Sequence, residues 1–371
     1  MKSIHVPVHF DESFDIFTGH GILNYIPQHL VENPLGNRYK IFVSNSVADL
    51  YGRPLYEGMK ECGLNVTVEA CEDGEEIKRI EIVTEIGRIL HREGFDRKDC
   101  AIIVSGGSLT DTIGFVAGTY KRGCNYINVP TTFIGQTDAG IGGKTGVNDE
   151  SGKNMMGMFY NPRRVYNDTG LLVSLPDPEI TNGMGEVIKY WLGFHSDMRE
   201  YLERNRDKIF GHDQEAYEFI VSESSAIKAN IVRQDPRETK DIRTCLNLGH
   251  TGAHGIEKAT NYKLSHGLAV GLGLLVASRI SVNRRWMKGS ELERTSALLD
   301  QYGLPTKLDL EKYPVTRDDI IAPMIHDKKA VSGVINFVLL TGIGSLKKNN
   351  NGGYSNPATP QEIYKALDVI F

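Results

Sequence analysis

The sequence predicts an α/β protein, with a parallel sheet in its N-terminal part and a mostly α-helical C-terminal part. In the first half, short apolar segments alternate with helical patterns, and this alternation is typical of a parallel sheet. From Asp177 to about Gln301, helical periodicity dominates instead. A chain of 371 residues suits two domains, and Gly170 and Pro176-Asp177-Pro178 mark the change. We therefore expect domains at residues 1–176 and 177–371.

The N-terminal part opens with two predicted short strands in residues 3–17, forming a hairpin. Buried strands are predicted at Tyr39–Val43, Val66–Glu69, Ala101–Val104 and Tyr126–Val129. A helical pattern reaches Met59, and Asp73 to Lys78 opens an amphipathic helix that runs to about His91. In such a sheet, ligands bind beyond the carboxyl ends of the strands, so the residues after each strand are the first candidates for a site.

The turn Ser105-Gly106-Gly107-Ser108-Leu109-Thr110-Asp111 lies between a strand and an apolar helix. Glycine lets a phosphate approach the backbone, and the helix N-terminus offers free N–H groups. The GxGxxG pattern is absent, and a plain tight turn accounts for a glycine pair about half the time. Pro130-Thr131-Thr132 places two hydroxyls after the next strand, where a nucleotide could lie.

A polar, glycine-rich stretch from Gln136 to Asn154 is predicted to be a loop, either exposed surface or the lining of a site. It contains Asp138, Gly142-Gly143-Lys144-Thr145 and Gly152-Lys153-Asn154. The first glycine of the GxxxxGK[ST] motif is missing, which excludes an ATP-binding P-loop.

The strongest chemical signal lies between Arg243 and His266. His250 and His254 are four residues apart, and Asn247 precedes His250 by three, so a helix would place all three on one face. Glu186 and Lys189 are three apart on another predicted helix. Histidines with a carboxylate are the usual ligands of a catalytic divalent metal, zinc first, with cobalt or manganese as alternatives. A single helical histidine is more often an ordinary core or surface residue.

The predicted C-terminal helices are Met184–Leu192, Glu215–Val232, Asn247–Ala259, Ala269–Val282 and Leu292–Tyr302. A strand pair is expected at Val334–Thr341, a mobile polar loop at Lys347–Gly353 and a short helix from Thr359.

Composition narrows the class of protein. The net charge of −5 argues against nucleic acid or an anionic membrane as the main partner. Five scattered cysteines without a CxxC pair indicate reduced thiols rather than disulfides or a cysteine zinc site. We find neither a signal-peptide pattern nor an apolar run of membrane-spanning length, so a cytoplasmic enzyme is expected.

At this point the chain resembles the dehydroquinate synthase family of sugar phosphate cyclases over nearly its whole length. The motifs that carry the resemblance are Thr119-Tyr-Lys-Arg-Gly123, Val129-Pro-Thr-Thr132, Asp138 with Gly-Gly-Lys144-Thr-Gly-Val-Asn148, Gly152-Lys-Asn154, Asn182-Gly-Met-Gly-Glu-Val-Ile-Lys189, Asn247-Leu-Gly-His250 and His326-Asp-Lys-Lys329.

The resemblance implies a Rossmann-like N-terminal domain that binds NAD, a metal-binding C-terminal domain and a homodimer. The implied metal ligands are Glu186, His250 and His266. The implied catalytic residues are Asp138, Lys144, Lys189, Arg243, Asn247 and His254. The implied substrate-binding residues are Arg122 (from the neighbouring subunit), Asn154, Lys228 and Lys329. The implied cofactor-binding residues are Asn45, Glu75, Lys78, Gly106, Gly107, Asp111, Thr131, Thr132, Lys153 and Ser174.

The implied reaction eliminates phosphate from 3-deoxy-arabino-heptulosonate 7-phosphate and closes the ring to 3-dehydroquinate in the shikimate pathway, with NAD used catalytically. Alternatives are a sister cyclase making amino-dehydroquinate, 2-deoxy-scyllo-inosose or 2-epi-5-epi-valiolone, an NAD- and metal-dependent polyol dehydrogenase, and a non-catalytic cofactor-binding protein. The chain departs from the family pattern at Ser105, at Gly252-Ala253, at Leu268 and in the Asn-rich stretch 348–352. The segment from Asp235 to Arg243 is one residue longer than usual and lacks the usual glutamate near Arg243.

Overall fold

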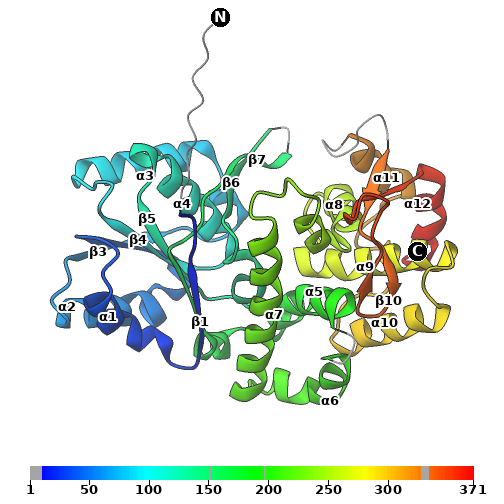
Figure 1. The fold of residues 1–371 in the computed structure, drawn as a ribbon, viewed down its shortest axis with the longest axis horizontal. Helices are drawn as coiled ribbons and strands as arrows, with labels where there is room; N and C mark the ends of the chain where they lie inside the picture. The colour runs from blue at the N-terminus through cyan, green and yellow to red at the C-terminus, as the bar shows by residue number, and fades with distance from the viewer. Residues whose placement is uncertain (1–10, 151, 196–197, 327–333) are drawn as a thin grey trace, which may run out of the picture. The chain divides into compact units, whose positions relative to one another are not determined.

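The computed structural model describes residues 11–150, 152–195, 198–326 and 334–371. It divides into two compact units. Unit 1 contains residues 21–130 and 140–167 with the N-terminal segment up to Phe17. Unit 2 contains residues 131–139 and 168–371 with Thr18–His20. Figure 1 shows the elements of both units.

Unit 1 is built on a six-stranded sheet of order β1-β8-β5-β4-β2-β3. The pairs β2–β3, β2–β4, β4–β5 and β5–β8 are all parallel, as predicted. β2 and β4 are buried along their whole length, which explains why their sequences are mostly apolar. The charged residue of β2, Lys40, is paired with Glu69 and Glu93. The strands are β1 (Asp15–Gly19), β2 (Tyr39–Ser44), β3 (Val66–Cys71), β4 (Cys100–Ser105), β5 (Asn125–Pro130) and β8 (Arg164–Asp168).

Helices cover both faces of this sheet, with α1 and α2 on one side and α3 and α4 on the other (Figure 1). Their bounds are α1 (Ile22–Glu32), α2 (Arg53–Glu61), α3 (Ile80–Arg92) and α4 (Gly107–Thr119). The helix expected from Asp73 begins only at Ile80. Glu75–Ile77 forms a separate 3₁₀ turn, η3, because Lys78 has a non-helical ψ of 64°. The expected hairpin in residues 3–17 lies largely outside the described residues, and β1 forms an edge of the main sheet.

The glycine-rich stretch after β5 contains an antiparallel hairpin rather than only a loop. β6 (Lys144–Asp149) pairs with β7 (Gly152–Phe159). Close approach explains two of its glycines: a Cβ on Gly146 would lie 2.8 Å from the Met156 carbonyl oxygen, and a Cβ on Gly157 would lie 2.6 Å from that of Thr145. The glycines that suggested a loop therefore allow the two strands of this hairpin to pair closely.

Unit 2 is mostly helical, and the predicted helices are present with shifted ends. The helices are α5 (Asp177–Phe194), α6 (Met198–Phe210), α7 (Gln214–Gln234), α8 (His250–Ala259), α9 (His266–Asn283), α10 (Gly289–Gln301), α11 (Arg317–His326) and α12 (Pro360–Ala366). Of these, α6 and α11 were not predicted. α9 packs against α5, α8, α10 and α12 and forms the centre of the helical core. By length and composition α9 could span a membrane, contrary to our expectation, but 72% of it is buried, as in a core helix.

The C-terminal strands pair differently from the prediction. β9 (Ile335–Phe337) pairs with β12 (Asn356–Ala358), and β10 (Leu340–Gly342) pairs with β11 (Ser345–Leu346), so the segment 334–341 is not one hairpin. The polar stretch expected to be a mobile loop is held by hydrogen bonds around Asn349. The short helix after Thr359 is α12, and Thr359 and Glu362 form its capping box.

Candidate metal and anion site

Three side chains from three helices of unit 2 meet at one point. Glu186 comes from the middle of α5, and His250 and His266 begin α8 and α9. His266 Nε2 lies 3.0 Å from Glu186 Oε1, and His250 Nε2 lies 3.4 Å from the same oxygen. One ligand atom from each residue lies within 4.8 Å of the others. Two imidazoles and a carboxylate around one point can hold a divalent cation and leave positions open for substrate.

Glycines allow these helices to come so close. A Cβ on Gly185 would lie 2.2 Å from the Gly267 carbonyl oxygen, and a Cβ on Gly267 would lie 1.7 Å from that of Asn182. The backbones of α5 and α9 therefore touch where Glu186 and His266 face each other. The Asn182 side chain secures the crossing by accepting a 2.8 Å hydrogen bond from the Gly267 amide.

A second carboxylate, Glu257, lies behind His266 and was not predicted from the sequence. It is 3% exposed, and its Oε1 lies 3.4 Å from His266 Nδ1. Burial by itself would lower the pKa of His266, but its hydrogen bonds to Glu186 and Glu257 raise that pKa to about 10. A carboxylate on the outer nitrogen of a ligating histidine fixes its ring and tautomer.

Cations surround the carboxylates. Lys189, 1% exposed, lies 2.6 Å from Glu186 Oε2 and 3.6 Å from Asp138 Oδ2. Lys228 from α7 also pairs with Asp138 and donates a 2.7 Å hydrogen bond to its backbone oxygen. The unpredicted Tyr190 donates to Asp138 Oδ1 at 2.8 Å. Asp138 is thus the hub of a buried charge network.

The pKa shifts follow from this network. Burial opposes ionisation of Asp138 and Glu186, but the nearby Lys189 keeps the pKa of both carboxyls below the usual range. Burial would lower the pKa of Lys189, and Asp138 and Glu186 raise it. Burial lowers the pKa of Lys228 to about 8, although Asp138 opposes the shift. Lys228 is therefore the cation of the site closest to losing its charge near neutral pH.

Arg243 and Asn247 lie on a separate 3₁₀ turn, η7 (Arg243–Asn247). Asn247 does not share a helix with His250, contrary to our prediction, because Gly249 has a φ of 78° and α8 begins only at His250. Burial lowers the pKa of the Arg243 guanidinium, and the negative charge of Glu238 opposes this shift. Glu238 Oε1 accepts a 3.2 Å hydrogen bond from Asn247 Nδ2. Glu238 was not predicted as a site residue, and this segment therefore contributes a carboxylate that contacts the predicted Asn247.

The other predicted residues of unit 2 differ in how closely they join this cluster. The exposed His254 ring lies 5.7 Å from that of His250, centroid to centroid. Thr131 is buried, Thr132 Oγ1 accepts from the Gly135 amide, and Ser174 Oγ donates to the Leu171 carbonyl.

In unit 1, three predicted cofactor residues form a second charge network. Lys78, 4% exposed, donates a 2.7 Å hydrogen bond to Asp111 Oδ2, and its Nζ lies 3.9 Å from Glu75 Oε1. Burial would lower the pKa of Lys78, and Asp111 and Glu75 raise it. Glu75 also accepts hydrogen bonds from Ser108 at 3.2 Å and from Asn148 at 2.9 Å.

These residues lie just beyond the carboxyl ends of parallel strands. Asn45 follows β2, and Gly106 and Gly107 begin α4 directly after β4. The arrangement offers α4 amides and charged side chains at the edge of the sheet where nucleotides bind in such folds.

The hairpin and η4 (Tyr120–Arg122) carry the remaining predicted residues of unit 1. Lys144 is exposed at the start of β6, and Lys153 is half-buried at the start of β7. The Asn154 amide donates to Asn148 Oδ1 at 2.8 Å. Arg122 is exposed with a φ of 67°. Lys329 lies outside the described residues.

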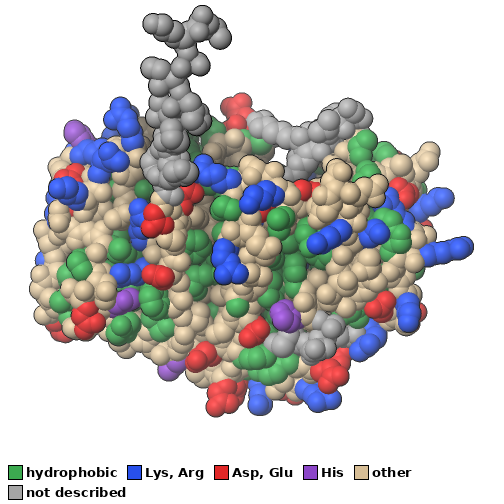
Figure 2. Space-filling model, viewed as in Figure 1, with side chains coloured by type: hydrophobic (Ala, Val, Ile, Leu, Met, Phe, Trp, Pro, Cys, Tyr) green, Lys and Arg blue, Asp and Glu red, His purple; other side chains and the backbone are tan. Residues whose placement is uncertain are grey.

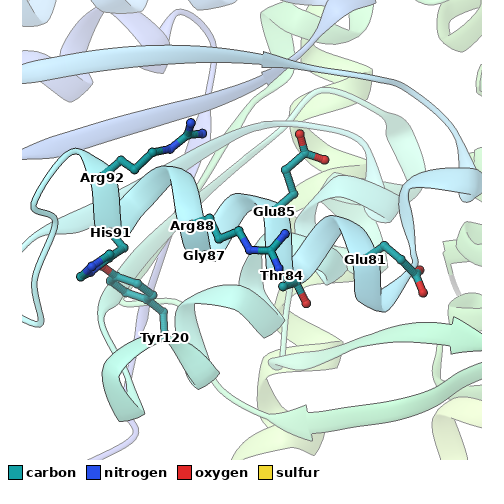
Figure 3. Close-up of a pocket in the computed structure, with 8 residues that line it drawn as sticks. All are labelled: Glu81, Thr84, Glu85, Gly87, Arg88, His91, Arg92 and Tyr120. Atoms are coloured by element: carbon teal, nitrogen blue, oxygen red, sulfur yellow. The ribbon is translucent and has the colours of Figure 1, made fainter.

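The pocket drawn in Figure 3 is elsewhere on unit 1. It has a volume of about 780 Å³ and lies along the outer face of α3 beside Tyr120, lined by Glu81, Thr84, Glu85, Gly87, Arg88, His91, Arg92 and Tyr120. None of the predicted site residues lines it. Acidic and basic side chains both line this pocket, as they do on the surface shown in Figure 2, and they give it no single charge that would select one ligand.

Comparisons with known proteins agree on one family. Residues 68–182 match the 3-dehydroquinate synthase N-terminal profile, and residues 183–330 match the C-terminal profile. The 3-dehydroquinate synthase of Sulfolobus acidocaldarius is 36% identical over 91% of this chain and 92% of its own.

Two solved structures share the fold. A 2-deoxy-scyllo-inosose synthase, complexed with carbaglucose-6-phosphate, NAD⁺ and Co²⁺, superimposes with a TM-score of 0.86 at 25% identity over 95% of both chains. The 2-epi-5-epi-valiolone synthase of Streptomyces hygroscopicus, with NAD⁺ and Zn²⁺ bound, gives 0.88 at 25% identity over 98% of both chains.

Proposed function

Since the chain belongs to the 3-dehydroquinate synthase family of sugar phosphate cyclases, we propose that it converts 3-deoxy-arabino-heptulosonate 7-phosphate into 3-dehydroquinate and phosphate. Such a reaction breaks a carbon–oxygen bond by elimination, so the enzyme is a lyase. The observation that carries the proposal is the meeting of Glu186, His250 and His266 beside Lys189 and Lys228.

A divalent metal, zinc first and cobalt next, fits the donor set of Glu186, His250 and His266. When bound, the metal would supply Lewis acidity toward substrate hydroxyls, and NAD would supply a reversible hydride acceptor. The fixed cations Lys189, Lys228 and Arg243 bind the anionic groups of the substrate and hold it in one orientation. Asp138 keeps the two lysine ammonium groups in place, and Asn247 and His254 orient polar groups of the substrate.

The NAD site is proposed on unit 1, at Asn45, Gly106, Gly107, Lys153 and the Glu75–Lys78–Asp111 network. The family resemblance also assigns Thr131, Thr132 and Ser174, which belong to unit 2, to cofactor binding. The buried Lys78 pair supports this assignment, because a charge network at the carboxyl end of a parallel sheet is placed for nucleotide binding. The proposal thus divides the work between residues 1–176, which bind NAD, and residues 177–371, which bind metal and substrate.

A sugar phosphate that carries a carboxylate is favoured over sugar phosphates without one, such as glucose 6-phosphate and sedoheptulose 7-phosphate. Arg243, Lys228, Asn247 and His254 are all present, and Arg243 is buried within the same unit as the metal cluster. Relatives named 3-dehydroquinate synthase that match about 90% of this chain are 33–39% identical to it, whereas sister cyclases of known structure are 24–25% identical.

We further propose that the enzyme works as a cytoplasmic homodimer in the shikimate pathway. Arg122 supports this arrangement. It is exposed, and Lys121 and Arg122 both have positive φ, at 47° and 67°. Tyr120 and Lys121 are anchored on the Phe95 carbonyl oxygen, which leaves Arg122 projecting outward for a neighbouring subunit. Lys144, Asn154 and Lys329 are assigned to the substrate as part of the same proposal.

The test is to incubate the purified protein with 3-deoxy-arabino-heptulosonate 7-phosphate, NAD and Zn²⁺ and to follow phosphate release and NADH absorbance together. Phosphate release without accumulating NADH supports the proposal. Phosphate release only from sedoheptulose 7-phosphate or glucose 6-phosphate would identify a sister cyclase. Steady NADH formation with a simple polyol would identify a dehydrogenase.

A further inference from the structure

Two unusual segments of the sequence meet in unit 2. One is the long connection from Asp235 to Arg243, and the other is the asparagine-rich loop that ends near Ser355. They are far apart in the chain, but Asp241 joins them through direct hydrogen bonds. Their meeting point is two residues from Arg243, which is 1% exposed and belongs to the proposed substrate site.

Asp235 is the inner anchor of the long connection. It is fully buried at the end of α7, and its carboxylate accepts hydrogen bonds from the amides of Thr239, Lys240, Ile242 and Arg243, at 2.8–3.2 Å. The chain therefore wraps around one carboxylate. This places the Arg243 backbone, and the Arg243 guanidinium donates back to the Pro236 carbonyl at 2.7 Å.

Asp241 is the outer anchor. Its Oδ2 accepts from Asn349 Nδ2 at 3.0 Å and from the Ser355 amide at 3.2 Å, and its Oδ1 accepts from Ser355 Oγ at 2.7 Å. Its backbone oxygen accepts from the Tyr354 amide at 3.2 Å. Four hydrogen bonds thus tie Asp241 to the loop 349–355.

Asn349 organises that loop from within. Its side-chain Oδ1 accepts hydrogen bonds from the backbone amides of Asn351 and Gly353 at 2.9 and 3.0 Å. Its backbone amide donates to the Gly353 carbonyl at 2.8 Å. Gly353 is buried, and a Cβ there would lie 2.0 Å from Asp241 Oδ2. The loop is therefore shaped to receive the Asp241 carboxylate and has no room for a side chain at position 353.

The connection needs such support because its backbone is strained. Glu238 and Asp241 both have left-handed conformations, with φ of 54° and 55°. Non-glycine residues in this region persist only where the surroundings hold them. Glu238, one of these two left-handed residues, is also the residue whose carboxylate accepts the hydrogen bond from Asn247.

We propose that Asn349 and Asp241 are positioning residues, and that the loop 349–355 braces the segment carrying Glu238 and Arg243 for binding an anionic group of the substrate. The substrate part of this inference rests on the proposed function, whereas the bracing part does not. Without the brace, the outer end of the connection is released, and the hydrogen bonds of the Thr239, Ile242 and Arg243 amides to Asp235 open more often. Arg243 and Glu238 then sample more orientations, which weakens binding more than it slows chemistry.

The test compares Asn349→Ala with Asn350→Ala, the same substitution at an exposed neighbour in the same loop. Asn349→Ala should raise KM for the heptulosonate phosphate about tenfold and change kcat little, because the two hydrogen bonds that the Asn349 side chain donates and the two that it accepts are lost. Zinc content and the Kd for NAD should stay at wild-type values. Gly353→Ala should give the same pattern by displacing Asp241, and Asn350→Ala should behave as wild type.

Hydrogen exchange of the amides of Thr239, Ile242 and Arg243 provides a readout that needs no substrate. Faster exchange in Asn349→Ala, with a raised KM, supports the inference. Unchanged exchange, or faster exchange with an unchanged KM, overturns it. If the wild-type protein releases no phosphate from this substrate, the proposed function fails by itself, and the exchange comparison decides whether the loop braces the segment.

Discussion

Glu186→Gln tests the metal cluster and the charge network with one atom changed. The substitution keeps the size of the side chain but removes the negative charge that faces His250, His266 and Lys189. Glu186 is 0% exposed and Lys189 is 1% exposed, so water cannot replace the lost charge. We expect zinc affinity to fall by more than about 100-fold, since loss of a mere supporting partner already lowers it 10–100-fold.

The metal-free protein should also lose stability, and the structure sets the size of that loss. Breaking a buried ion pair by removing one partner costs about 3–5 kcal/mol. The lower end applies here, because Asp138 remains 3.6 Å from Lys189. A loss of about 3 kcal/mol lowers Tm by roughly 6–12 °C for a unit of about 200 residues.

The assay is calorimetry of both proteins in excess chelator, followed by titration with Co²⁺ under visible absorbance. The double variant Glu186→Gln/Lys189→Met is the control. It removes both charges of the pair and should regain most of the lost Tm without regaining metal affinity. Wild-type cobalt affinity in Glu186→Gln would refute the ligand assignment. A double variant less stable than the single one would refute the account of the ion pair.

Four other variants probe separate parts of the reasoning. Glu257→Gln should weaken cobalt binding about 10–100-fold by loosening His266, and an unchanged titration would leave Glu257 a structural residue. Because burial lowers the pKa of Lys228 to about 8, the free enzyme loses this charge as pH rises, so kcat/KM should fall above about pH 8. Lys228→Arg should move that fall to higher pH, and an identical profile would count against the assignment. Lys144→Ala should lower turnover strongly with the Kd for NAD kept, and a normal rate would make Lys144 an ordinary surface lysine. Gly267→Ala should abolish cobalt binding and lower Tm, because its Cβ would lie 1.7 Å from a carbonyl oxygen, and normal binding would contradict the tight helix crossing.

The parallel sheet could be predicted because its central strands are buried on both faces. β2 and β4 have no exposed residue, so apart from Lys40 their sequences are mostly apolar between turn residues. The hairpin β6–β7 could not be predicted in the same way, because glycines, lysines and asparagines obscure its alternation. Only Thr145 to Val147 are buried in β6, and strand pairing at Gly146 and Gly157 depends on contacts eleven residues apart.

The predicted metal ligands meet, but the prediction that Asn247 lies on the same helix as His250 was wrong. The spacing of Asn247 and His250 suggested one helix, and Gly249 separates them with a left-handed turn. Glu238 was not predicted, because sequence spacing does not indicate that a left-handed backbone at this residue accompanies a contact of its side chain with Asn247. Sequence spacing loses its meaning where the backbone is not regular.

The long-range part of the site depends on backbone contact rather than on side-chain pattern. Glu186 and His266 are 80 residues apart, and no periodicity within either helix states that they face each other. What brings them together is that Gly185 and Gly267 remove the side chains that would separate α5 from α9. The glycines beside these ligands therefore indicate which helices are in contact, which the ligands themselves do not indicate. Where a glycine directly flanks a candidate ligand on each of two buried helices, the sequence indicates which two helices meet as well as which atoms bind.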